Sequence, residues 1–279
     1  MLSYRHGYHA GNFADVLKHL VQVEILHYMQ QKDKPFDYID THAGAGLYPM
    51  GGGMAIQNRE FQTGIDPLYS DVTKLPGLER YLAQVAAFNP SGRLQTYPGS
   101  AAIACNMLRP VDKAWLFELH PNDSQTLKSH CAGRNVHIRE SDGFAGLAAL
   151  LPSSSRRALV LIDPPYELKQ DYQRVIEALK LIHRKMPGAV VALWYPVVDR
   201  ARIDRLERDV IATGIRRIDL FELGIQADRP GHGMTSSGMM VINPPWMLKV
   251  SMAQVLPAVA ERLAQEPGAP LRIETLVGE

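Results

Sequence analysis

Short apolar segments with little polar–apolar alternation constrain the fold of this chain more than any other feature. Helical stretches, such as residues 172–186 and 203–212, separate most of these segments. Strands without alternation are buried on both faces, which is typical of a mostly parallel sheet covered by helices on both sides. The sequence therefore predicts the α/β class, with strands at residues 36–40, 114–117, 136–138, 158–162, 189–194, 215–221 and 239–242.

The first helix is predicted from its capping residues. Asn12 can cap the helix, and Asp15 stands at the capping-box spacing. Apolar residues then recur at helical spacing until the helix ends near Lys32.

One spacing departs from a plain βαβ unit. The second strand of such a unit begins roughly 20–30 residues after the first, whereas more than 70 residues separate Asp40 from Ala114. Pro49 and three glycines interrupt the start of this stretch, and residues 78–85 have a helical composition. We therefore predict a small helical subdomain, residues 50–98, inserted into an α/β domain made of residues 1–49 and 99–279.

Composition limits the partners and the compartment. The net charge is +1, so no global electric field indicates a nucleic-acid partner. The two cysteines are too few for a disulfide framework or, alone, for a zinc site. No signal peptide is recognisable, and the longest uncharged apolar stretch, residues 188–198, is shorter than the ~20 residues of a membrane span. We expect a cytoplasmic protein that binds neither a membrane nor a metal.

The motif Asp163-Pro164-Pro165-Tyr166 follows an apolar strand and so falls at the carboxyl edge of a parallel sheet, where ligands bind. The exocyclic amine of a base is a poor nucleophile because its lone pair is conjugated with the ring. If Asp163 and a backbone carbonyl accept its two N–H bonds, the nitrogen becomes more pyramidal, while Tyr166 stacks on the ring. The alternative is a Pro-Pro turn with a surface tyrosine.

A similar motif, Asn243-Pro244-Pro245-Trp246, also follows an apolar strand. Asparagine has one acceptor oxygen and cannot take a proton, so it suits the loss of an amine proton less well. We predict that Asp163 is catalytic and that Asn243 is structural, near the rim of the sheet.

Acids and glycines recur after the earlier strands. Asp40-Thr41-His42-Ala43-Gly44-Ala45-Gly46 follows the first strand and lets a nucleotide approach the backbone, but Pro49 breaks the dinucleotide fingerprint. Glu118 ends the second strand, where an acid can accept both hydroxyls of a ribose. Asp142-Gly143 lies just past the third strand, where it could bind an adenine amine. Each of these residues alone is also compatible with a solvated strand end.

Together these motifs resemble a known enzyme family. Asp40-x-x-Ala-Gly-x-Gly46 followed by Asp163-Pro-Pro-Tyr166 resembles the S-adenosylmethionine-dependent adenine-N6 methyltransferases. Residues 4–19, 97–100, 118–121 and 194–198 are similar to the bacterial 23S ribosomal RNA methyltransferase family that modifies N6 of adenine 2030.

The resemblance implies a Rossmann-like fold with an inserted helical subdomain, S-adenosylmethionine as cofactor, and free or partly assembled 23S rRNA as the partner. We also expect a monomer. It implies that Asp163 is the proton acceptor and that Tyr4 contacts the RNA. The cofactor contacts that it implies are His19, His42, Ser100, Glu118, Asp142, Gly143 and Asp163. A DNA adenine-N6 methyltransferase and a catalytically silent RNA-binding protein of the same fold are the alternatives.

Overall fold

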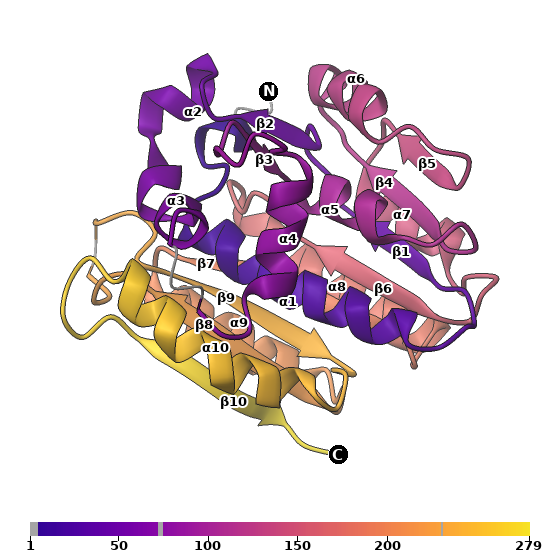
Figure 1. Cartoon of the computed structure of the whole chain (residues 1–279). Helices are drawn as coiled ribbons and strands as arrows, with labels where there is room; N and C mark the ends of the chain where they lie inside the picture. The colour runs from indigo at the N-terminus through magenta and orange to yellow at the C-terminus, as the bar shows by residue number, and fades with distance from the viewer. Residues whose placement is uncertain (1–4, 72–74, 230) are drawn as a thin grey trace.

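A computed structural model of the chain describes residues 5–71, 75–229 and 231–279 (Figure 1). Its centre is an eight-stranded sheet in the order β10-β8-β9-β7-β6-β1-β4-β5. The strands are β1 (Asp37–Asp40), β4 (Lys113–Phe117), β5 (Val136–Arg139), β6 (Ala158–Ile162), β7 (Val190–Val197), β8 (Ile218–Gly224), β9 (Ser236–Ile242) and β10 (Leu271–Val277).

The five strands from β5 to β7 pair in parallel. Strand β9 lies antiparallel between β7 and β8, and β10 joins the edge antiparallel to β8. Every residue of β1 and β6 is buried, which explains why neither strand alternates in polarity. The predicted α/β class with a mostly parallel sheet and a Rossmann-like arrangement is confirmed.

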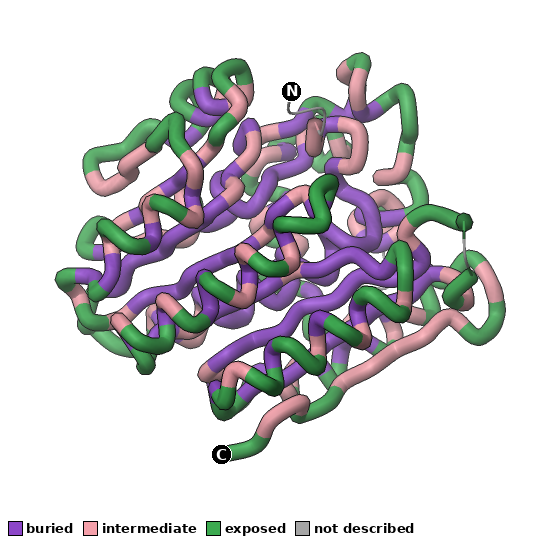
Figure 2. Tube along the Cα trace, turned by 180° about the vertical axis from the view of Figure 1, so that it is seen from behind, coloured by how far each residue is buried: buried purple, intermediate pink, exposed green. Residues whose placement is uncertain are grey.

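Helices cover both faces of the sheet, and each face has its own apolar core. One core includes residues of α1 (Phe13–Gln30), α5 (Ser100–Met107), α6 (Pro121–His130) and α10 (Leu248–Leu263). The other includes residues of α7 (Gly143–Leu150), α8 (Lys169–Lys185) and α9 (Arg200–Ala212). Figure 2 shows the buried strands between helices whose outer sides are exposed.

Helix α1 is buried on nearly all sides because the sheet lies beneath it and other helices pack around it (Figure 1). Asn12 caps it as predicted, since its side chain accepts a hydrogen bond from the backbone N–H of Asp15. Asp15, Lys18, His19 and Gln22 are all buried in this helix. Buried charged groups need partners. Asp15 and Lys18 form an ion pair with each other beside the cavity described below.

Residues 50–98 contain α2 (Gly53–Asn58), the 3-10 helix η2 (Glu60–Thr63), α3 (Ile65–Tyr69) and α4 (Glu79–Ala87). A two-stranded antiparallel ribbon that we did not predict, β2 (Leu47–Pro49) with β3 (Thr96–Pro98), joins this stretch to the sheet. Ile65, Leu68 and Tyr81 share the apolar core of α1. The boundaries 1–49, 50–98 and 99–279 remain a prediction.

The carboxyl-terminal strands differ from the prediction in detail. Strand β9 begins at Ser236 rather than Met239, and its first three residues are small and buried. The close packing needs small residues there, since a Cβ on Gly238 would lie 2.0 Å from the Tyr195 ring. Strand β8 begins at Ile218 rather than Ile215, and β10 was not predicted. A 3-10 helix, η1 (His6–Tyr8), precedes α1. Among the helices of the described residues, none combines the length and apolar character needed to cross a membrane.

Candidate active site

A cavity opens at the carboxyl ends of β1, β4, β5 and β6. The chain runs from β1 outward to β4 and β5, then returns to the other side of β1 through β6. Ligands of open α/β sheets bind at such a reversal of strand order. The lining residues include His6, Lys18, His42, Gly44, Ser100, Glu118, Leu119, Asp142, Gly143, Asp163, Leu168 and Arg174.

The turn after β1 forms one wall. Buried Asp40 accepts hydrogen bonds from the Ser100 hydroxyl (2.7 Å) and from the backbone N–H of His42 (3.2 Å), which joins α5 to this turn. Gly44 has φ +62°, and a Cβ there would lie 2.2 Å from the Tyr48 hydroxyl, so glycine is required. Burial lowers the pKa of His42 to about 4, so its imidazole is neutral at pH 7.

Glu118, directly after β4, presents a carboxylate that accepts hydrogen bonds from two backbone donors. One oxygen accepts from the Gly44 N–H (2.9 Å) and the other from the His120 N–H (2.7 Å). Burial raises its pKa. Within the described residues no cation pairs with this carboxylate, so it remains available to hydroxyl donors in the cavity.

Asp142 caps α7 at the end of β5. One of its oxygens accepts from the backbone N–H of Phe144 (2.9 Å), and the other pairs with Arg174, whose guanidinium lies 4.6 Å from the Phe144 ring centre. Burial would raise the pKa of Asp142, but Arg174 outweighs it, so the net pKa is lowered. A Cβ on Gly143 would lie 2.1 Å from the Thr41 carbonyl oxygen, so glycine allows α7 to approach β1.

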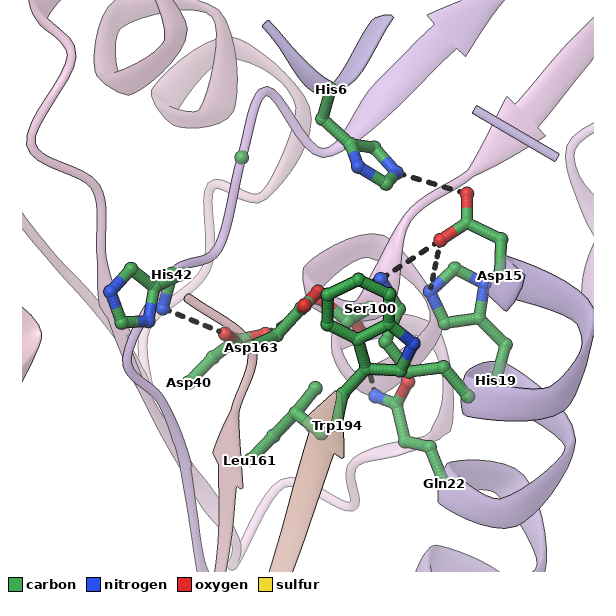
Figure 3. Close-up of polar contacts among 12 residues, drawn as sticks. His6, Asp15, His19, Gln22, Asp40, His42, Ser100, Leu161, Asp163 and Trp194 are labelled. Carbon is green, nitrogen blue, oxygen red and sulfur yellow. Dashed lines mark hydrogen bonds and ion pairs between the residues drawn. The ribbon is translucent and has the colours of Figure 1, made fainter. Parts of the chain in front are cut away.

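Asp163, directly after β6, lies between His42 and the buried residues of α1 (Figure 3). Its Oδ2 is 2.6 Å from Lys18 Nζ, and its side chain is only 14% exposed. The Lys18 ammonium also lies 2.8 Å from Asp15 and 5.8 Å from the centre of the Trp194 ring. Burial lowers the pKa of Lys18, but Asp15 and Asp163 outweigh burial and raise the net pKa, so Lys18 is charged.

The structure thus brings together six of the residues expected to contact the cofactor: His42, Ser100, Glu118, Asp142, Gly143 and Asp163. His19 is not among the lining residues. Its Nδ1 bonds to the Tyr97 hydroxyl (2.7 Å), and its ring is fully buried behind the cavity. Contact between His19 and the cofactor stays a prediction, because the helical pattern alone does not show which side of a buried helix faces a cavity.

Tyr166 is likewise not among the lining residues. Its hydroxyl donates to the Trp194 carbonyl (2.7 Å), and its ring packs 4.6 Å from that of Tyr172, so it does not line the cavity. Stacking of Tyr166 on a base stays a prediction. The predicted RNA contact Tyr4 lies outside the described residues.

Asn243 lies far from this cavity. Because β9 is antiparallel to β7, the motif that follows β9 is at the opposite edge of the sheet. The Asn243 side chain donates to the carbonyls of Pro187 and Ala189, both at 2.8 Å. This supports the structural role predicted for Asn243, although β9 is an inner strand rather than a rim strand.

Sequence reasoning missed Asp15 and Lys18 as site residues. Asp15 was interpreted as a capping residue and Lys18 only as part of the stretch 4–19, although two charged residues spaced i, i+3 among apolar neighbours were a usable signal. Their role becomes visible only when β6 brings Asp163, 145 residues away in the chain, against Lys18.

Comparison with known proteins shows to which family the chain belongs. The family model described as ribosomal RNA large subunit methyltransferase D, RlmJ, matches residues 33–275. The chain belongs to this family. The ribosomal RNA large subunit methyltransferase J of Escherichia coli is 47% identical, with 94% of each chain covered. The protein of the same name from Haemophilus influenzae is 42% identical, with 100% of both chains covered.

Solved structures share the fold of this chain. A Legionella pneumophila protein superposes with a TM-score of 0.88 at 34% identity, covering 96% of this chain and 98% of that one. A probable spermidine synthase from Corynebacterium glutamicum has a TM-score of 0.50 at 12% identity, covering 97% of this chain and 77% of that one. The second likeness concerns the fold alone.

Proposed function

We propose that this protein transfers a methyl group from S-adenosylmethionine to the N6 amine of an adenine in 23S rRNA. The family resemblance suggests adenine 2030 as the target. The observation that carries the proposal is the position of Asp163-Pro164-Pro165 on the wall of the cavity at the reversal of strand order. Membership of a ribosomal RNA methyltransferase family supports the class of reaction and of substrate.

The lining residues fit the proposed cofactor. Glu118 offers a carboxylate that pairs with no cation of the described residues to a ribose diol, and Asp142 with the start of α7 offers polar groups to an adenine. Leu119 and Leu168 add exposed apolar side chains to the wall, which suit the face of a base. S-adenosylmethionine would supply an electrophilic methyl group. His42, Ser100 and Gly143 would complete its site.

Asp163 and the residues after it would act on the target amine. Pro164 and Pro165 line the cavity and have no backbone N–H, so they add no donors there that would compete for a backbone carbonyl acceptor. Asp163 accepts one N–H of the amine and a backbone carbonyl accepts the other, which localises the lone pair on nitrogen. The methylated nitrogen is positively charged until it loses a proton, and Asp163 is the acceptor for that proton.

Glu118→Ala is expected to weaken cofactor binding more than it slows the chemical step. A charge-assisted hydrogen bond is worth about 1.5–3 kcal/mol, so the dissociation constant of S-adenosylmethionine should rise by about 10- to 100-fold. Isothermal titration calorimetry measures this change. Glu140→Ala, which removes an exposed carboxylate outside the cavity, is the matched control. Unchanged affinity in Glu118→Ala would place the ribose elsewhere.

The substrate is tested with a short RNA hairpin that carries the target adenine and with the same hairpin in DNA. An adenine must leave its stack to reach a cavity of this kind, and unpaired loop bases are the usual targets of sequence-selective RNA readers. We expect methylation of the RNA hairpin and much slower methylation of the DNA hairpin. Equal rates on both would favour the alternative, a DNA adenine-N6 methyltransferase.

Asp163 and Glu118 line one cavity, which argues against a silent RNA-binding protein. Action on 23S rRNA would also place the protein in the cytoplasm. We further propose that the chain acts as a monomer without a metal, that residues 50–98 form the inserted subdomain, and that Tyr4 contacts the RNA.

A further inference from the structure

Asp15 lies at the centre of a buried polar cluster beside the cavity (Figure 3). Its Oδ2 accepts hydrogen bonds from His6 Nε2 and from the backbone N–H of Gly11, both at 2.9 Å. Its Oδ1 is 2.8 Å from Lys18 Nζ and 3.9 Å from His19 Nε2. The side chain is 1% exposed, so four groups surround a carboxylate that water does not reach.

Helix capping does not account for this carboxylate. In a capping box the side chain of Asp15 would accept from the backbone N–H of Asn12. That N–H donates instead to the His9 carbonyl (3.1 Å). The Asp15 carboxylate is therefore directed toward the segment that precedes α1 and toward Lys18.

Asp15 does not line the cavity, but it holds two residues that do, His6 and Lys18. The Lys18 ammonium bridges Asp15 and Asp163 at 2.8 and 2.6 Å. Asp163 Oδ2 is thereby engaged, whereas Oδ1 accepts no hydrogen bond from the described residues. The orientation of Asp163 thus depends on where Lys18 is held.

The charges of the cluster support this dependence. Burial raises the pKa of Asp15, but His6 and Lys18 outweigh burial, so the net pKa is well below the ordinary value and Asp15 is ionised. Burial lowers the pKa of His19 to about 3, so that imidazole is neutral and does not replace Lys18. Lys18 is the cation shared by the two carboxylates.

We propose that Asp15 is a positioning residue for methyl transfer, which acts by holding the Lys18 ammonium on one oxygen of Asp163. The other oxygen of Asp163 then faces the target amine, from which it accepts a hydrogen bond. This inference rests on the proposed function, because it assigns Asp15 a part in the same reaction.

The test is Asp15→Asn, which keeps the shape and leaves Lys18 paired with Asp163. We expect the single-turnover rate on 23S rRNA to fall by about 10²-fold, as for a misplacement of about 1 Å, while calorimetric affinity for S-adenosylmethionine stays within about twofold. Glu24→Gln is the matched control, because it neutralises another buried carboxylate of α1. Glu24 pairs with Arg80 at 3.0 Å and does not line the cavity. It should retain the wild-type rate.

Two further measurements separate positioning from a general structural effect. In a double-mutant cycle, adding Asp15→Asn to Lys18→Met should cause no further loss of rate, because Asp15 acts through Lys18. NMR of the lysine side chains should show Lys18 losing its proton at lower pH in Asp15→Asn than in the wild type, whether or not the protein methylates RNA.

Three results would overturn the proposal: a wild-type rate in Asp15→Asn, additive losses in the cycle, or an unchanged Lys18 titration. A parallel loss of cofactor affinity and rate would also overturn it, since it would indicate general damage to the fold. Failure of the proposed function would look different, because the wild-type protein itself would then leave 23S rRNA unmethylated.

Discussion

Asp163→Asn is expected to lower the single-turnover rate of RNA methylation by about 10²–10⁴-fold, the usual effect of losing a positioned proton acceptor. Asparagine keeps the shape and one acceptor oxygen but loses the charge and the ability to take a proton. The fold should persist because Lys18 keeps its second carboxylate, Asp15, at 2.8 Å. Cofactor affinity should therefore change little, and calorimetry with S-adenosylmethionine checks this.

Asn243→Ala is the control for that experiment, because Asn243 belongs to the similar motif at the opposite edge of the sheet. Its rate per folded molecule should equal that of the wild type. Near-normal single-turnover methylation by Asp163→Asn would refute the role assigned to Asp163.

Lys18→Met is expected to destabilise the fold as well as slow the reaction. Removing one partner of a buried ion pair costs about 3–5 kcal/mol because the remaining charge is left uncompensated. Here two carboxylates lose the ammonium, and Asp15 is almost fully buried. Urea denaturation at pH 7 measures the change in the free energy of unfolding. Arg80→Met, which removes a half-exposed cation paired with Glu24 of α1, should cost about 1 kcal/mol or less.

The cost of Lys18→Met should depend on pH in a defined direction. Burial raises the pKa of Asp15, but His6 and Lys18 hold it well below its ordinary value. A carboxyl with a lowered folded-state pKa stabilises the protein above its unfolded pKa, about 3.9, and this stabilisation is lost as the pH falls through the folded-state pKa. Without Lys18 the pKa of Asp15 rises, so the deficit should be largest at neutral pH and smaller in acid. A deficit that grew on acidification would contradict this account.

The strand ends of the site were predictable, whereas the contacts of α1 were not. Glu118, Asp142 and Asp163 each follow a short apolar strand, and parallel strands place their carboxyl ends along one edge. Helix α1 gave no such guide, because it is buried on nearly every side. Its periodicity therefore could not show that Lys18 faces the cavity while His19, the next residue, lies behind it.

Strand β10 illustrates a second limit. Its alternating sequence is that of an edge strand with one half-exposed face, but periodicity alone does not assign it a partner. The antiparallel direction of β9, which carries Asn243 away from the cavity, likewise depends on pairing between distant segments. Pairing between distant segments therefore determined the partner of β10 and the direction of β9, which the local sequence patterns do not show.

The most direct test of the central claim is mass analysis of nucleosides from unmodified 23S rRNA after incubation with the protein and S-adenosylmethionine labelled in its methyl group. The account predicts labelled N6-methyladenosine at a single adenine, and none with Asp163→Asn on the same timescale. Label on another nucleoside or on another atom of adenine, or no label in the RNA, would contradict it.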